Sequence, residues 1–248
     1  MKNTLLKHRS IRKFKSAPIP EETLRELLEA ASRASTCGNM QLYSLVVTRD
    51  EQLRRRLLPC HFGQQMVVEA PCVVTVCADI HRFSTWCRQR EAEPAYDNFA
   101  WFLTASIDAL LAAQNFSVAA EAAGLGICYL GTTIYTAGDI CRILELPKGV
   151  IPVTTIVTGY PDEKPDLTDR LPLEAVVHYE KYNDYTAAEI DELWAEREES
   201  ELTKRLLAEN ELPNLARIFT ERRYVREDNL SISRSYLALL KERGFLNQ

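Results

Sequence analysis

The stretch NFAWFLTASIDALLAAQNFSVAAEAAGLGICYLG, residues 98–131, decides the fold. Residues 98–123 are apolar on nearly every face of a helix, which predicts one long helix buried at the centre of the protein. Gly124 follows it as a natural C-cap, and residues 127–130 favour a strand. Polar or charged side chains interrupt the apolar run at Asp108, Gln114, Asn115 and Glu121. It is therefore too broken to span a membrane, which needs about 18 or more nearly uninterrupted apolar residues.

Further helices and strands are expected on the amino-terminal side of this stretch and beyond it. Apolar residues at positions 24, 27, 28 and 31 have the spacing of an amphipathic helix, predicted over residues 20–34 with Pro20 in its first turn. β-Branched residues predict strands at 43–48, 72–78 and 153–159. Because helices alternate with strands to about residue 160, we expect an α/β (α+β) fold.

The character of the chain changes after residue 160. Thr186-Ala-Ala-Glu189 is a capping box that predicts a highly charged helix running to about Asn210. A last helix is expected from Ser233 to Gly244. We expect one domain over residues 1–248, with a core at 1–160 and an extension at 161–248 that lies over the core and reaches a partner subunit.

Composition limits the functions that the chain can have. Its 248 residues include 30 Lys or Arg and 35 Asp or Glu, a net charge of −5. This mild acidity argues against nucleic-acid binding, which needs a basic face. Residues 1–10 lack the apolar core of a signal peptide. We therefore expect a cytoplasmic protein with neither a nucleic acid nor a membrane as its partner.

Cysteine and histidine spacing predicts no metal site. The seven cysteines contain no Cys-x-x-Cys pair, and the four histidines contain no His-x-x-x-His pair. Cys72, Cys77 and Cys128 lie in apolar stretches, so we expect them to be buried as small hydrophobic side chains.

The first cluster with chemical potential is His8-Arg9-Ser10-Ile11-Arg12. Two guanidinium groups and a hydroxyl suit a phosphate monoester, because arginine binds phosphate through paired donors and the hydroxyl donates to a third oxygen. The alternative is a solvated basic patch.

The second cluster, Thr36-Cys-Gly-Asn-Met-Gln41, lies between the first helix and the first strand. Small residues allow a flat ligand to approach the backbone closely. Asn39 and Gln41 each offer a donor and an acceptor, which the pyrimidine edge of a flavin requires. The alternative is a polar helix-to-strand loop.

Glycines form the third cluster, in Gly124-Leu-Gly126-Ile-Cys-Tyr129-Leu-Gly131. They would allow backbone N–H groups to face a ligand ring. The motif is not a dinucleotide fingerprint, because its Gly-x-Gly follows a helix instead of opening one.

Arg170 is the fourth candidate, in Asp166-Leu-Thr-Asp169-Arg-Leu-Pro172. It could supply a further cation for a phosphate. The alternative is a surface ion pair with Asp166 or Asp169.

The order of these motifs is more specific than any one of them. The chain carries His-Arg-Ser-Ile-Arg, Gly-Asn-Met-Gln, Ala-Ala-Glu-Ala-Ala-Gly-Leu-Gly, Gly-Tyr-Pro and Arg-Leu-Pro in that order. Between about Leu5 and Tyr182 it resembles the nitroreductase family, and within it the nitroreductase A and NADPH–flavin oxidoreductase branch. The resemblance implies a central, mostly antiparallel sheet flanked by helices, a C-terminal helical extension and a homodimer with FMN at its interface.

The resemblance also implies which residues bind the cofactor. His8, Arg9, Ser10, Arg12 and Arg170 would hold the phosphate and the adjoining ribityl chain. The isoalloxazine ring would lie against Cys37, Gly38, Asn39, Gln41, Gln64, Tyr129, Leu130 and Gly131. Relatives hold the 2′-phosphate of NADPH with an arginine of the extension. Here Arg234 is the nearest candidate, and Arg222, Arg223 and Arg226 compete with it.

The chain departs from the branch at two cofactor positions. Thr36-Cys37-Gly38 stand where serines are common, in a loop that is one residue shorter. Thr168 stands where the branch often has a second basic residue before Arg170.

By resemblance, the chain is an enzyme that transfers hydride from NAD(P)H, with NADPH favoured, through FMN to nitroaromatics, quinones or flavins in a ping-pong mechanism. The flavin carries the chemistry, and no side chain is assigned a catalytic role. Three alternatives stay open: an FMN-binding protein without turnover, a flavin reductase or dehydrogenase with a specialised non-nitro substrate, and a structural domain with an interaction tail.

Overall fold

The computed structural model describes residues 2–247, which form two compact units. The first unit contains the chain up to Leu167 together with the residues from Ile232 onward, and the second contains Thr168–Ser231. Each unit is described on its own below.

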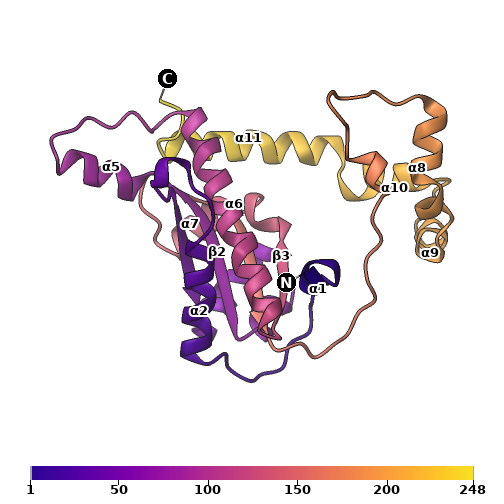
Figure 1. Ribbon diagram of the computed structural model, residues 1–248, viewed down its shortest axis with the longest axis horizontal. Coiled ribbons are helices and arrows are strands. Elements are labelled where there is room, and N and C mark those ends of the chain that lie inside the picture. Colours follow the sequence, from indigo (N-terminus) through magenta and orange to yellow (C-terminus); the bar gives the residue numbers. More distant parts are fainter. Residues whose placement is uncertain (1, 248) are drawn as a thin grey trace. The chain divides into compact units, whose positions relative to one another are not determined.

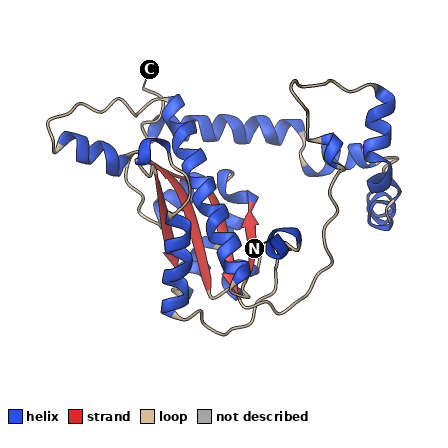
Figure 2. Cartoon of the chain, viewed as in Figure 1, coloured by secondary structure: helices blue, strands red, loops and turns tan. Residues whose placement is uncertain are grey.

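A four-stranded antiparallel sheet forms the centre of the first unit (Figures 1 and 2). Its strands are β1 (Tyr43–Thr48), β2 (Cys72–Asp79), β3 (Gly126–Leu130) and β4 (Val150–Gly159), in the order β1-β2-β4-β3. All four lie where the sequence predicts strands, and the mixed α/β architecture with an antiparallel sheet is confirmed.

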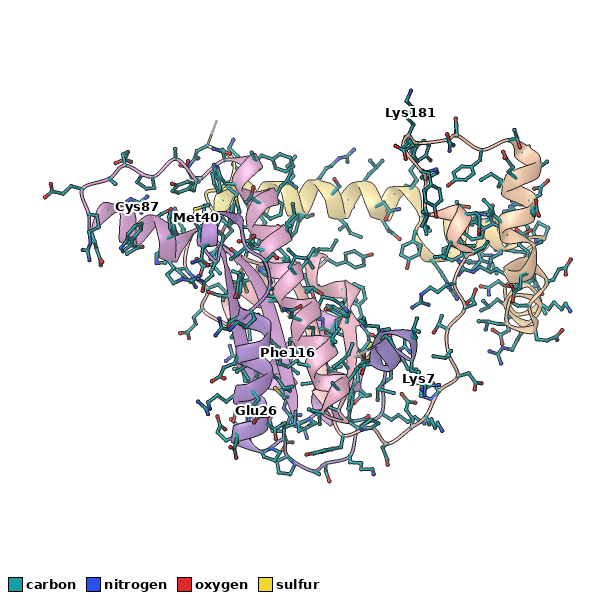
Figure 3. All side chains as sticks on the ribbon, viewed as in Figure 1. Lys7, Glu26, Met40, Cys87, Phe116 and Lys181 are labelled. Atoms are coloured by element: carbon teal, nitrogen blue, oxygen red, sulfur yellow. The ribbon has the colours of Figure 1, made fainter. Side chains whose placement is uncertain are left out.

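Two helices cover one face of this sheet, α2 (Glu21–Ser32) and α6 (Phe99–Ala122). Pro20 lies at the N-cap of α2, one position before the first turn in which the sequence placed it. Successive strand residues point to opposite faces, so Val74 and Val76 pack with Phe116 of α6 (labelled in Figure 3), while Val73 packs on the far side.

The expectation that α6 is buried all round is wrong. One face packs on the sheet through the small residues Ala105, Ala109, Ala112, Ala113 and Ala120, none of which is exposed. The opposite face leaves large apolar side chains open: Phe99, Leu103, Ile107, Leu110 and Leu111. We call these five residues the α6 stripe. Uniform hydrophobicity cannot separate a face that packs in the chain from one that is covered by something else.

By length and composition, α6 is long and apolar enough to cross a membrane, the one such helix in the described part of the chain. Its contacts with α2 and with all four strands make it the core helix of the first unit. Asp108 is buried in its middle and bonds to the loop before β1.

The other face of the sheet is covered by shorter elements that the sequence analysis did not predict. They include α3 (Glu51–Leu57), α4 (Met66–Glu69) and α7 (Ala137–Ile143), which enclose a second apolar cluster with Val157 and Leu130. Two further helices of the first unit are α1 (Lys2–Leu6) and α5 (His81–Arg88).

The second unit is helical and corrects one prediction. The charged helix expected from the Thr186 capping box to about Asn210 is two helices, α8 (Ala187–Glu199) and α9 (Glu201–Asn210). Ser200 separates them because its backbone is extended and its hydroxyl caps α9 by accepting from Thr203 N. A short α10 (Leu215–Ile218) and a π-helical turn (Phe219–Arg223) follow.

The last helix, α11, spans Arg226–Glu242 and thus begins before the expected Ser233. Its carboxyl-terminal half belongs to the first unit, where Leu240 and Phe245 pack with Phe102. Gly244 beyond it has the left-handed φ of +82° that suits a helix end.

All seven cysteines are free, and every one except Cys37 is buried. Cys72 and Cys128 are packed in apolar clusters and Cys77 is fully buried, so all three are buried as the sequence predicts. Burial raises the pKa of the Cys72 thiol to about 12 and also raises that of Cys128. These thiols therefore stay protonated and act as core residues.

His61 is a fully buried titratable group under the sheet. Its Nδ1 lies 2.9 Å from Thr132 Oγ1, and its Nε2 has no partner among the described residues. Burial lowers the pKa of His61 from 6.5 to about 4, because the charged ring would lose its hydration. The imidazole is therefore neutral in the folded protein at neutral pH.

We predict that His61 makes the protein less stable in mild acid. The unfolded chain binds this proton below about pH 6.5, whereas the folded chain binds it only near pH 4. The free energy of unfolding therefore decreases as the pH is lowered from 6.5 to about 4, by up to about 3 kcal/mol. His61→Gln should remove this slope in urea unfolding at pH 7 and pH 4.5. The control is His81→Gln, which changes an exposed histidine. Identical pH dependence in the wild type and His61→Gln would contradict the assignment.

Candidate functional site

The amino-terminal basic segment lies along the outer edge of β3. Ser10 forms a parallel bridge with Ile127, and Ile11 N donates to Ile127 O at 2.9 Å. The approach is so close that a Cβ on Gly126 would lie 2.6 Å from Ile11 Cγ1. Only glycine therefore admits the segment at this place, and the contact fixes Arg9, Ser10 and Arg12 relative to the sheet.

The two arginines of this segment retain free donors. Arg9 is half-buried, and its Nε is enclosed without a partner among the residues that the structure describes. Arg12 is exposed, and no carboxylate of residues 2–247 lies within 4.0 Å of its guanidinium. The carboxylate of Glu163 is instead held by backbone N–H groups, those of Arg12 at 2.5 Å and Lys13 at 3.1 Å.

A shallow pocket of about 330 Å³ adjoins the segment. Its lining includes Lys7 (labelled in Figure 3), Arg9 and Gly126. His8 already has a partner, because its Nδ1 lies 2.7 Å from the carboxylate of Glu121 on α6, which also lines the pocket. Lys7 and Arg9 thus bring two cations to this pocket, and anion binding by the first sequence motif stays a prediction.

The loop between α2 and β1 presents the two amide side chains. A 3₁₀ turn spans Cys37–Asn39, and Gly38, Asn39 and Gln41 all have left-handed φ angles of 53° to 55°. Left-handed backbone is uncommon for glutamine and often marks a functional loop. Gln41 Nε2 lies 3.5 Å from Asn39 Oδ1, and both side chains are exposed. The pair can thus offer donors and acceptors together to a ligand edge.

Two turns that carry further predicted residues lie side by side. Gln64 is half-buried and follows the 3₁₀ turn at Pro59–His61, while Gly131 begins the turn at Gly131–Ile134. Two hydrogen bonds join the turns. His61 Nδ1 lies 2.9 Å from Thr132 Oγ1, and Thr136 Oγ1 donates to Cys60 O at 2.6 Å. These joining contacts could not be predicted from the sequence, since no local pattern marks side chains that bond so far apart in the chain.

Tyr129 and Leu130 point into the protein. The hydroxyl of Tyr129 lies 3.0 Å from Ser117 Oγ on α6, and Leu130 is 1% exposed in the cluster under the sheet. Beyond them, Gly131 is exposed, with open space where a side chain would be. These positions therefore offer a ligand mainly backbone, apart from the partly exposed Tyr129 ring.

Arg170 lies in the second unit and is exposed. Its guanidinium donates to the carbonyls of Thr168 at 3.2 Å and Asp169 at 2.8 Å. The carboxylate of Asp169 binds Arg197 instead, at 2.6 Å. That Arg170 binds the same phosphate as the cations of the first unit stays a prediction.

Arg234 is exposed on α11 and belongs to the first unit. Of its competitors, Arg223 lies over the ring of Phe219, 5.5 Å from its centroid. No group of three or more His, Cys, Asp or Glu side chains within residues 2–247 is arranged to hold a metal ion.

Comparison with known proteins decides the family. The model of the family described as "Nitroreductase family" matches residues 5–160. This chain belongs to the nitroreductase family.

Curated and solved proteins resemble this chain over much or all of its length. The FMN reductase (NADPH) of Bacillus subtilis (strain 168) is 34% identical over 182 residues, 73% of each chain. A Bacteroides fragilis NCTC 9343 protein described as an oxidoreductase is 47% identical, with a TM-score of 0.97 over 99% of this chain and all of that one. The NADPH:FMN oxidoreductase from Vibrio harveyi, complexed with NAD⁺, is 26% identical, with a TM-score of 0.83 over 100% of this chain and 99% of that one. The structural likeness thus extends beyond Tyr182, where the resemblance in sequence motifs ends.

Proposed function

We propose that this nitroreductase-family chain is an oxidoreductase that binds FMN and uses NADPH to reduce small electron acceptors. One observation carries the proposal: the first unit contains both an arginine donor without a partner among the described residues, Arg9 Nε, and the exposed amide pair of Asn39 and Gln41. Relatives named for FMN and NADPH support the choice of cofactor and coenzyme.

The phosphate end of FMN fits the segment beside β3. Arg9 has a buried donor without a partner, and a phosphate oxygen would satisfy it. Arg12 could add a forked pair of charge-assisted bonds, and Ser10 a hydroxyl donor. We propose His8 as a neighbour of the ribityl chain, and Arg170 as the cation that the second unit adds.

The ring end fits the loop that carries Asn39 and Gln41. A flavin pyrimidine edge shows an N–H between two carbonyls, which the amide pair matches. We propose that the surroundings of the ring are completed by Cys37, Gly38, Gln64, Tyr129, Leu130 and Gly131.

Bound FMN would supply two-electron chemistry between NADPH and an acceptor such as a nitroaromatic, a quinone or a free flavin. The protein's part is to hold the ring and to direct donors at its pyrimidine edge, where reduction gathers negative charge. We propose one site for coenzyme and acceptor in turn, hence ping-pong kinetics. Arg234 is our candidate for the 2′-phosphate of NADPH, with Arg222, Arg223 and Arg226 as alternatives.

We propose that two copies of the chain associate through the α6 stripe. Leu103, Ile107 and Leu110 are 47%, 59% and 48% exposed, and with Phe99 and Leu111 they lie on one helix. An apolar patch of this kind marks an interaction surface more often than open solvent. We propose the cytoplasm as the location, since the buried face of α6 packs on the sheet instead of facing lipid.

Absorbance and steady-state kinetics test the function. The purified protein should show a flavin spectrum, as isolated or after FMN is added, and should oxidise NADPH faster than NADH. Parallel double-reciprocal lines with nitrofurans, quinones and free FMN would support the ping-pong proposal. Bound FMN without turnover would instead favour a storage or sensing protein, turnover confined to non-nitro acceptors would favour a specialised reductase, and a colourless protein that takes up no FMN would end the proposal.

Arg12→Ala should weaken FMN binding without comparable loss of stability. Hydrogen bonds to charged groups contribute about 1.5–3 kcal/mol, so Kd should rise roughly 10- to 100-fold. Fluorescence titration gives Kd, and thermal unfolding without FMN gives stability. Arg33→Ala is the control, since Arg33 is exposed and its side chain makes no polar contact with the described residues. Equal effects of the two substitutions on Kd would return Arg12 to a solvated patch.

Ile107→Glu should disrupt association, because a charge at the centre of the α6 stripe would be desolvated on pairing. Sedimentation velocity should show a rise of about tenfold or more in the dissociation constant, with an unchanged circular dichroism spectrum. Arg25→Glu, an exposed substitution on α2, should leave association intact. A wild-type chain that is monomeric at all concentrations would exclude the dimer.

A further inference from the structure

Asp108 is a buried carboxylate in an otherwise apolar stretch of α6. It is 2% exposed, and no Lys, Arg or His within the described residues pairs with it. Burying a carboxylate is costly unless several hydrogen bonds replace its hydration. The partners of Asp108 therefore indicate why an acid stands at this position.

Within the described residues, every side-chain hydrogen bond of Asp108 goes to the loop that presents Asn39 and Gln41. Its Oδ1 accepts from Cys37 N at 3.0 Å, while its Oδ2 accepts from the Thr36 hydroxyl and from Leu42 N at 3.3 Å. One carboxylate thus ties both ends of the loop to the core helix.

The same network reaches Gln41 itself. Gln41 N donates to Thr36 Oγ1 at 2.9 Å, so its N–H is fixed through the hydroxyl that Asp108 holds. Its carbonyl accepts from Arg82, which also donates to Tyr43 O at 3.1 Å. Asp79 is 5% exposed and holds Arg82 in turn, accepting from its backbone N–H at 3.1 Å. Both backbone groups of Gln41 are therefore fixed.

The loop needs this restraint because its backbone is unfavourable. Left-handed φ angles at Asn39 and Gln41 persist only where surrounding contacts impose them. The amide groups of these residues make no side-chain contact with the described residues other than within the pair. Their direction is thus set by the backbone, and the backbone is set by Asp108 and Arg82.

We infer that Asp108, with Arg82 as a second anchor, is a positioning residue that directs the amide pair at the flavin ring. The inference rests on the proposed function. It separates two parts of the cofactor site: the arginines beside β3 act on the phosphate, and Asp108 acts on the ring through the loop.

Asp108→Asn tests this division. An amide can replace only one of the two accepting oxygens, so its NH₂ would face either Cys37 N–H or the Leu42 N–H. Riboflavin, which lacks the phosphate, is the discriminating probe. Fluorescence titration should show that Asp108→Asn weakens FMN and riboflavin by the same factor, roughly tenfold or more, whereas Arg12→Ala weakens FMN alone.

Two further measurements exclude a merely structural effect. At saturating FMN, the midpoint potential of the bound flavin should become more negative in Asp108→Asn, because donors at the pyrimidine edge stabilise the reduced form. Phe116→Leu is the control, a fully buried side chain of α6 that packs with Val74 and Val76 and makes no hydrogen bond to the loop. It should lower stability without changing the potential.

Arg82→Met keeps the test decisive if Asp108→Asn does not fold. The Arg82 side chain is 53% exposed, so its loss should leave the core intact. Arg88→Met, an exposed arginine of the same helix, is its control. Wild-type affinities and potential in every folded variant at positions 108 and 82 would overturn the inference. A wild-type protein that binds neither flavin would instead overturn the proposed function.

Discussion

The first unit depends on the close approach between α6 and the sheet. Alanines on the inner face of the helix let its backbone lie near β2 and β4, and Phe116 fills the space between. Because interiors are packed at nearly crystalline density, this contact leaves little freedom to the elements at its edges. The Asn39–Gln41 loop is one of them, since Asp108 bonds to it from the middle of the helix. The segment that carries Arg9 and Arg12 is another. It bonds to β3 through Ile11 N, and it can approach so closely because Gly126 has no side chain.

This arrangement assigns three tasks to one helix. The inner face of α6 forms the core, its middle anchors a loop, and its outer face leaves an apolar stripe for a second copy in our proposal. The chemistry proposed for the site needs this rigidity, because hydrogen-bond donors stabilise a developing charge best when they are already in place. A single long helix is a simple way to obtain it.

Much of the first unit could be predicted from local pattern. Each of the four strands is a short β-branched or apolar run, and α2 has a clear amphipathic period, so their positions follow from residues near in sequence. The basic and amide motifs were also visible, and their order indicated the family that comparison confirms. Long-range features were not accessible in this way. Asp108 stood out only as an interruption of an apolar run, and nothing local shows that its partners lie some 70 residues earlier. Three predictions were wrong for a related reason: those for the outer face of α6, the break at Ser200 and the start of α11. Hydrophobicity and charge do not show what covers a surface or which polar residue will cap a helix.

The unequal burial of the cysteines has a practical consequence. Six thiols are enclosed, and Cys37 alone is exposed, two residues from Asn39. A small alkylating reagent should therefore modify the native protein at one place, and mass spectrometry would detect a single adduct. If flavin covers that loop as proposed, protection of Cys37 from the reagent would report occupancy without any measurement of turnover.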